Sequence, residues 1–232
     1  MSAASQKPAG AKRKRVVVMI SGRGSNLNAL ISASMASGYP CRIVGVISDK
    51  PGAGGLQLAA DYGIETHVID RKDYATRDSH EEAIQTALQS MQPDIVCLAG
   101  YMRLLSGELV RKWLGSMINI HPSLLPSFPG LDTHQRVLTH QVRLHGCSVH
   151  FVTEGMDEGP VIAQAAVPVL PDDDAETLAA RVVKAEHRLY PSALRLVAEG
   201  RVKITDSGTV LFSDYPAADE NSILYSNEID AG

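Results

Sequence analysis

Apolar and polar residues along the chain fall into two alternating kinds of run, which predict strands and helices in turn. Short, continuous apolar runs are typical of strands buried on both faces, and they lie at 16–20, 43–47, 67–69, 95–99 and 117–121. Between them, apolar residues recur at helical spacing over 25–36, 54–62, 79–91 and 106–114. We therefore predict an α/β fold in which helices cover both faces of a mostly parallel sheet.

The pattern changes after residue 144. Residues 145–153 alternate apolar and polar side chains, and a turn with glycine and proline separates them from the apolar run at 161–169. We expect these two strands to pair antiparallel. Residues 174–199 predict a long closing helix with acidic residues in its first turn, and Pro191 should kink or divide that helix.

The chain has 232 residues, and we expect one domain over residues 15–205. Residues 1–14 contain a basic segment and predict a flexible extension. Residues 206–232 become polar and irregular, which predicts a poorly ordered tail.

Composition excludes several classes of function. The formal net charge is −4 and 44% of the residues are hydrophobic, which is ordinary for a globular protein and leaves no broad basic field for nucleic acid. Cys41, Cys97 and Cys147 are odd in number and far apart, so they predict neither a disulfide framework nor a zinc motif, and a reducing cytoplasmic setting fits best. No run approaches the roughly 20 apolar residues that cross a bilayer, so we expect no membrane partner.

Two polar residues, Asn119 and His121, interrupt the apolar run at 117–121. Pro122 disfavours a helical conformation for the residue before it, so this segment should be extended. Residues two apart in a strand point the same way, which brings an amide and an imidazole together. Such a pair can stabilise an oxyanion. Alternatively, both side chains only support the loop that follows.

The segment Ser-Gly-Arg-Gly-Ser-Asn at 21–26 lies between the first predicted strand and helix. Its backbone amides at Gly24, Ser25 and Asn26 would open a helix N-terminus, where a monophosphate binds well. Leu27 occupies the place of the third glycine in a dinucleotide fingerprint, so that motif is excluded. A plain N-cap by Ser25 or Asn26 is the alternative.

Asp157 lies in the turn between the last two predicted strands. If this turn folds back over His121, its carboxylate would favour the protonated imidazole; otherwise Asp157 only shapes the turn. The histidine spacing does not predict a metal site, because His145 and His150 should face opposite sides of their strand.

Several ordered motifs together resemble the phosphoribosylglycinamide formyltransferase family. They are SGRGSN at 21–26, AGYMRLLS at 99–106, INIHPSLLPSFPG at 118–130, HGCSVHFVTEGMDEGPVIAQAAVPV at 145–169, and the pairs Glu186-His187 and Tyr190-Pro191. The resemblance implies a single-domain, Rossmann-like formyltransferase fold. It also implies transfer of a formyl group from the cosubstrate 10-formyltetrahydrofolate to the glycyl amine of 5-phosphoribosylglycinamide in purine biosynthesis, without a metal.

The same resemblance assigns roles to individual residues. Asn119 and protonated His121 would stabilise the oxyanion, Asp157 would assist them, and His150 would support the site. The ribonucleotide would contact Gly24, Ser25, Asn26 and Glu186. The folate would contact Arg77, Met102, Arg103, Leu104, Leu105, Asn119, Thr153, Glu154, Gly155, Met156 and Asp157. The alternatives are that Met102, Leu104 and Leu105 belong only to the core, that Glu186 is a charge on an exposed helix face, and that each arginine forms only a surface ion pair.

Three other functions are compatible with parts of this pattern. A methionyl-tRNA formyltransferase should carry a further RNA-binding domain, for which residues 206–232 are too short. A formyltetrahydrofolate hydrolase should carry an N-terminal regulatory domain, for which residues 1–14 are too short. A non-catalytic nucleotide-binding module would not need Asn119, His121 and Asp157 together. We expect small-molecule partners, and a monomer or a homodimer.

Overall fold

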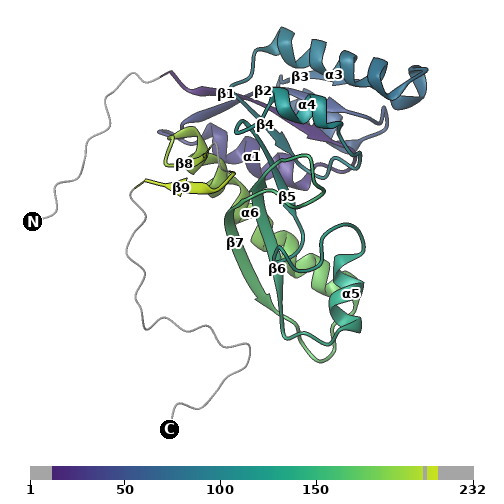
Figure 1. Ribbon diagram of the computed structural model, residues 1–232, viewed down its shortest axis with the longest axis vertical. Helices are drawn as coiled ribbons and strands as arrows, with labels where there is room; N and C mark the ends of the chain where they lie inside the picture. The colour runs from purple at the N-terminus through teal and green to yellow at the C-terminus, as the bar shows by residue number, and fades with distance from the viewer. Residues whose placement is uncertain (1–11, 206–207, 214–232) are drawn as a thin grey trace, which may run out of the picture.

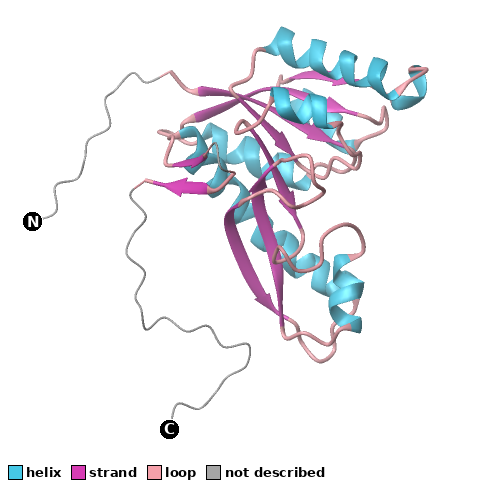
Figure 2. Ribbon diagram, viewed as in Figure 1, coloured by secondary structure: helices cyan, strands magenta, loops and turns pink. Residues whose placement is uncertain are grey.

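The computed structural model describes residues 12–205 and 208–213, and a seven-stranded sheet forms its centre (Figures 1 and 2). The spatial order of the strands is β3-β2-β1-β4-β5-β6-β7. Their bounds are β1 Lys14–Ile20, β2 Cys41–Ser48, β3 Glu65–Val68, β4 Ile95–Leu98, β5 Met117–His121, β6 Leu144–Phe151 and β7 Val161–Pro168. Strands β1 to β5 are parallel, whereas β6 runs antiparallel to both β5 and β7. The predicted mostly parallel sheet with an antiparallel C-terminal pair is confirmed.

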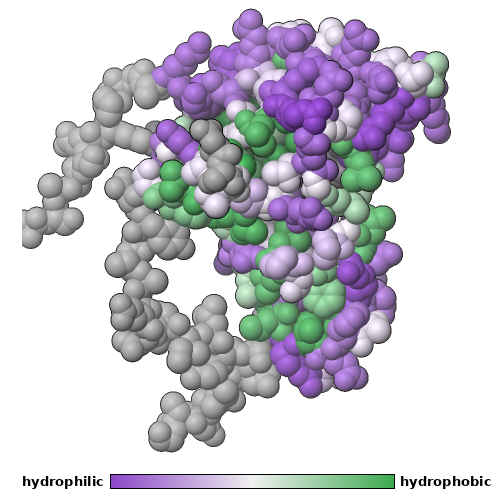
Figure 3. Space-filling model, viewed as in Figure 1, coloured by the Kyte–Doolittle hydropathy of each residue, from purple (hydrophilic) through white to green (hydrophobic). Residues whose placement is uncertain are grey.

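Helices pack on both faces of this sheet, as predicted (Figure 2). They are α1 Ser25–Met35, α2 Gly54–Asp61, α3 Arg77–Met91, α4 Gly107–Lys112, α5 Thr133–Thr139 and α6 Ala175–Ala198, with a short 3₁₀ helix at Arg71–Asp73. One core contains Leu30 of α1 and Tyr190 of α6, and the other contains Leu88 of α3 and Leu109 of α4. The outer surfaces of α3 and α4 are largely hydrophilic (Figure 3). Among the described residues, no helix is long and apolar enough to cross a membrane.

The order of the strands creates a switch point between β1 and β4. The chain proceeds from β1 to β2 and β3 on one side, and then returns to add β4 and β5 on the other side. The loops that follow β1 and β4 therefore diverge at the carboxyl ends of the strands, which is where α/β proteins bind ligands. Both the 21–26 loop and the end of β5 lie at this edge.

Helix α6 continues through Pro191, so this proline does not divide the closing helix, which was one of the two effects expected of it. Proline removes one backbone donor from a helix interior. Tyr190, Ala193 and Leu194 on either side of it are completely buried, and their packing against the sheet outweighs that loss. The Tyr39 hydroxyl also donates a hydrogen bond to the Pro191 carbonyl at 2.7 Å.

A small antiparallel hairpin follows α6, formed by β8 Val202–Ile204 and β9 Val210–Phe212. Strand β9 lies in the segment 206–232 that was expected to be a poorly ordered tail, so the predicted domain boundary at 205 falls inside this hairpin. Backbone pairing explains the difference, because Val202 is opposite Phe212 and Ile204 is opposite Val210. The remaining expectations for 1–11, 206–207 and 214–232 concern residues outside the described part of the chain.

Candidate active site

Asn119 and His121 point to the same side of β5, as the strand periodicity predicts. Ile118 and Ile120 pack into the core on the α6 side of the sheet, so the two polar side chains face the opposite side. Strand pairing places Asn119 opposite His150, and His121 opposite Ser148. The antiparallel strand β6 therefore adds a second imidazole to the predicted pair.

The turn that contains Asp157 folds back over this part of the sheet. Asp157 Oδ2 lies 3.3 Å from His121 Nδ1, and Asp157 Oδ1 lies 3.8 Å from His150 Nε2. Asp157 itself has φ of 57°, the left-handed conformation that reverses the chain sharply. A single carboxylate thus lies between two buried imidazoles, and the alternative that Asp157 only shapes its turn is wrong.

Both ring nitrogens of His121 face acceptors. Nε2 donates to the Phe128 carbonyl at 3.0 Å, while Nδ1 faces the Asp157 carboxylate. A carboxylate and a carbonyl can only accept hydrogen bonds, so the doubly protonated imidazolium satisfies both contacts at once. The His121 ring is thus held between a carbonyl and a carboxylate.

His150 favours the neutral form and orients Asn119. Burial lowers the pKa of His150, so its ring is neutral near pH 7. Its Nδ1 donates to the Phe151 carbonyl at 2.9 Å, which leaves Nε2 as an acceptor. That acceptor lies 3.1 Å from Asn119 Nδ2. The contact fixes which end of the Asn119 amide carries the NH₂ group and leaves its second N–H available to a ligand.

The loop after β1 presents bare backbone donors at the start of α1. Gly24 is the N-cap residue with φ of 81°, and no side chain caps the helix, so the alternative of a plain cap by Ser25 or Asn26 is wrong. The amides of the first turn of a helix have no partners within the helix. A Cβ at Gly24 would lie 2.7 Å from Gly55 Cα, so the close approach of the two loops requires glycine here. This geometry suits an anion.

Asn26 and Glu186 meet beside this loop. Asn26 Nδ2 donates to Glu186 Oε2 at 2.7 Å, and Asn26 Oδ1 is buried without a protein partner among the described residues. Glu186 is 6% exposed, so it is not a charge on an exposed helix face. Burial raises the pKa of the Glu186 carboxyl, and the hydrogen bond from Asn26 opposes that effect. A polar ligand would satisfy the group that the protein leaves unpaired.

The loop after β4 contains the predicted folate residues at 102–105. Met102 and Leu104 are 66% and 65% exposed, so the alternative that they are only core is wrong, whereas Leu105 packs partly into the α3-side core. Met156 in the opposing turn is 53% exposed. Exposed apolar side chains of this size, close to a polar cluster, are typical of a ligand wall.

Both predicted folate arginines already hold protein groups. Arg77 donates to the Leu104 carbonyl at 2.9 Å and pairs with Glu81 at 3.0 Å. Arg103 pairs with Asp49 at 2.7 Å, and the Asp49 side chain is only 1% exposed. These contacts support the loop after β4 from two sides.

The remaining predicted folate residues lie in the turn at 153–157. Glu154 is exposed and pairs with Arg111 at 2.5 Å, while Thr153 and Gly155 are half-buried. The structure thus brings Asn119, His121, His150 and Asp157 into one cluster. Asn26 and Glu186 form a second cluster, and Ser25 precedes Asn26 at the start of α1. Both clusters lie at the carboxyl edge of the sheet, with β4 between the strands that carry them.

Sequence reasoning missed two backbone groups that contact His121 and Asp157. The Phe128 carbonyl accepts from His121, and the Gly130 amide donates to Asp157 Oδ2 at 2.8 Å. The Pro129-Gly130 dipeptide signals a turn. No pattern in the sequence indicates where its backbone groups point.

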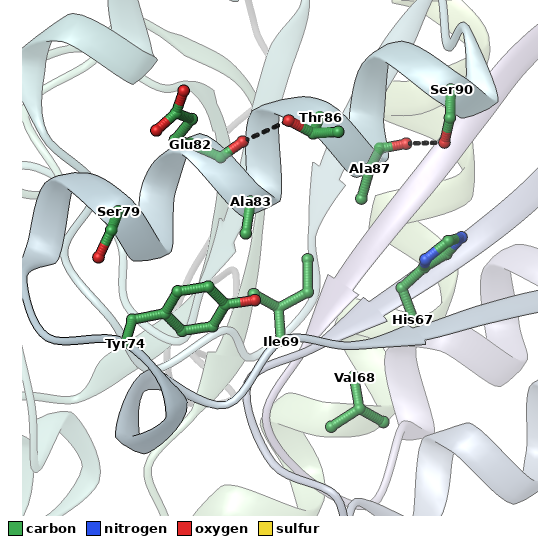
Figure 4. A pocket seen from close by; sticks show the side chains of 10 residues that line it. All are labelled: His67, Val68, Ile69, Tyr74, Ser79, Glu82, Ala83, Thr86, Ala87 and Ser90. Carbon is green, nitrogen blue, oxygen red and sulfur yellow. Dashed lines mark hydrogen bonds between the residues drawn. The ribbon is translucent and has the colours of Figure 1, made fainter.

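Two further features of the described residues do not coincide with this site. Within 12–205 and 208–213, no group of three or more metal-ligating side chains is arranged to hold a metal ion. A hollow of about 610 Å³ lies between β3 and α3 (Figure 4), and its walls include His67, Tyr74 and Glu82 but none of the predicted site residues.

Known proteins match this chain over most of its length. The formyl transferase family model matches residues 14–194. The trifunctional purine biosynthetic protein adenosine-3 of Bos taurus is 51% identical over 199 residues, which is 86% of this chain but 20% of that protein. The phosphoribosylglycinamide formyltransferase of Escherichia coli (strain K12) is 41% identical over 196 residues, covering 84% of this chain and 92% of that protein. The crystal structure of phosphoribosylglycinamide formyltransferase from Brucella melitensis is 61% identical, with a TM-score of 0.78 over 81% of this chain and 96% of that chain.

Proposed function

The chain belongs to the formyl transferase family, and we propose that it transfers the formyl group of 10-formyltetrahydrofolate to the glycyl amine of 5-phosphoribosylglycinamide. The observation that carries this proposal is the position of Asp157 between His121 and His150, with the Asn119 amide held beside them. An amide donor, a charged imidazole and a carboxylate are the groups that acyl transfer to an amine requires.

In the proposed reaction, the amine nitrogen attacks the formyl carbon and the carbonyl electrons move to its oxygen. Asn119 contributes the N–H that His150 leaves available, and His121 contributes positive charge near the developing oxyanion. Asp157 holds the imidazolium and accepts a proton from the attacking amine, directly or through water. The electrons of the oxyanion then re-form the C=O bond, the C–N10 bond breaks, and the proton passes to N10 of the folate.

The ribonucleotide phosphate is proposed to lie at the start of α1. Gly24, Ser25 and Asn26 provide the backbone donors, and the partial positive charge of the helix terminus favours an anion. Glu186 is proposed to accept from the ribose hydroxyls, and its buried position beside Asn26 supports that role.

The folate is proposed to lie between the loop after β4 and the turn at 153–157. Exposed Met102, Leu104 and Met156 provide apolar surface for the pterin ring. Arg103 lies on the loop after β4, and Arg77 contacts that loop from the start of α3; their half-exposed guanidinium groups retain donors for the anionic tail of the folate.

A steady-state assay with both substrates tests the proposal, with formylated ribonucleotide and tetrahydrofolate measured separately. We expect the two products to appear in equal amounts, and His121→Ala or Asn119→Ala to lower kcat by about 10²–10³-fold. Asn28→Ala, an exposed change on α1, is the control. Activity unchanged in His121→Ala would overturn the mechanism. Tetrahydrofolate formed without the ribonucleotide would instead identify a hydrolase.

A further inference from the structure

Phe128 adopts a backbone conformation that a bulky residue rarely takes. Its φ is 55°, in the left-handed region, where side chains other than glycine, asparagine or aspartate are strained. Strain of this kind persists only where surrounding contacts enforce it, and such residues concentrate at functional sites. The residues that hold Phe128 in this conformation are therefore candidates for a role in the site.

The segment from Phe128 to Gly130 contacts both His121 and Asp157, which are called the catalytic pair below. The Phe128 carbonyl accepts from His121 Nε2 at 3.0 Å, and the Gly130 amide donates to Asp157 Oδ2 at 2.8 Å. One short piece of backbone thus orients the imidazole and the carboxylate relative to each other. A rotation of the Phe128 peptide would remove the acceptor from His121.

Arg136 holds this segment from the side of α5. Its Nη1 donates to the Pro129 carbonyl at 2.5 Å and to the Leu131 carbonyl at 3.4 Å. The guanidinium carbon lies 5.5 Å from the centre of the Phe128 ring, a cation–π distance.

The other contacts of the segment also come from α5. The Phe128 ring meets His140 edge to face at 5.4 Å, and His140 Nδ1 donates to the Arg136 carbonyl at 2.8 Å. Val137, which is completely buried, anchors α5 in the core. Helix α5 lies beside β6 in Figure 1. These contacts thus fix Arg136 and the Phe128 ring to the body of the protein.

We propose that Phe128 and Arg136 are positioning residues, which hold the 128–130 backbone against His121 and Asp157 and so set the geometry of the catalytic pair. This inference rests on the proposed function. Neither side chain needs to touch a substrate for this role. Their loss should therefore lower kcat while leaving substrate binding nearly unchanged.

The test compares Arg136→Ala, Arg136→Lys and Phe128→Gly with a matched control, Arg143→Ala. Arg143 is exposed, lies shortly after α5, and its side chain makes no hydrogen bond or ion pair among the described residues. We expect Arg136→Ala to lower kcat by about 10-fold, because small misplacements of reacting groups are costly, with KM for both substrates within about twofold of the parent. Lysine keeps the charge but not the planar fork, so Arg136→Lys should restore only part of kcat. Phe128→Gly removes the ring and also the strain, so it should lower kcat while denaturant unfolding stays cooperative.

The ¹⁵N resonances of the His121 ring provide a readout that a merely structural role would not change. In the parent, Nε2 should carry a hydrogen-bonded proton, and in Arg136→Ala that resonance should shift while denaturant unfolding stays cooperative. An Arg136→Ala variant with the kcat of Arg143→Ala, or with an unchanged His121 spectrum, would overturn the proposed positioning role. An inactive parent would instead reject the proposed reaction itself, so the two failures are distinguishable.

Discussion

Asp157 Oδ2 lies 3.3 Å from His121 Nδ1, although 36 positions separate the two residues along the chain. The contact forms because β6 returns beside β5 and the turn after β6 then folds back over the sheet. The Gly130 amide holds the same carboxylate oxygen. The carboxylate therefore has a fixed orientation toward the imidazole before any substrate binds.

Asp157→Asn tests that contact directly. The amide keeps the shape of the side chain but removes the negative charge that holds the imidazolium, so we expect kcat to fall by about 10²-fold or more. KM for the ribonucleotide should change little, because its proposed contacts are elsewhere. Steady-state kinetics measure both values, and the exposed Asp172→Asn serves as the control. A variant that retains full kcat would show that the charge plays no part.

Asn26→Ala should mainly weaken ribonucleotide binding. It removes the amide that holds Glu186 and the buried oxygen that the protein leaves unpaired. Hydrogen bonds to charged groups contribute about 1.5–3 kcal/mol, so the dissociation constant of the ribonucleotide should rise by about 10-fold or more. Calorimetric titration measures the dissociation constant of each substrate, and Asn28→Ala is the control. Weaker folate binding with unchanged ribonucleotide binding would contradict the assignment.

His145 should make the protein less stable in mild acid. Its ring is 1% exposed and lies 3.1 Å from the His134 ring, and burial lowers the pKa of His145 from 6.5 to about 4. The unfolded chain binds the proton more readily than the folded one, so the free energy of unfolding falls as pH drops below 6.5 and levels off near 4. The shift corresponds to on the order of 3 kcal/mol.

Denaturant unfolding at pH 7.5 and pH 4.5 checks the His145 prediction. His145→Gln cannot take up a proton, so this variant should lose most of the difference in unfolding free energy between the two pH values. An equal loss of stability in parent and variant would mean that other groups cause the acid sensitivity.

Arg103→Ala should destabilise both the fold and the loop after β4. It leaves the Asp49 carboxylate buried, and one of its oxygens already lacks a partner among the described residues. Removing one partner of a fully buried pair costs about 3–5 kcal/mol, and because Arg103 is 38% exposed we expect about 2 kcal/mol. KM for the folate should also rise. Denaturant unfolding measures the loss of stability, and steady-state kinetics measure KM for the folate. Arg42→Ala, which changes an exposed residue on β2, is the control for both measurements.

Local sequence pattern was enough to predict the sheet, its helices and the shared face of Asn119 and His121. These features depend on hydrophobic periodicity and on the two-residue repeat of a strand, which are local properties. Pro191 does not divide the closing helix, one of the two effects expected of it, because long-range burial around it outweighs its local preference. The left-handed backbone of Phe128 was not predicted for a similar reason. It depends on contacts with Arg136, eight residues later, and no local sequence pattern indicates those contacts.

The Tyr190 hydroxyl lies 3.0 Å from the Leu98 carbonyl and 3.2 Å from the Ile118 carbonyl, at the centre of the sheet. Glu186, one turn earlier on α6, completes the ribonucleotide end of the proposed site. During synthesis on the ribosome, β4 and β5 emerge long before this helix does. A nascent chain stalled before residue 186 would therefore carry Asn119, His121 and Asp157 without the group proposed to hold the ribose.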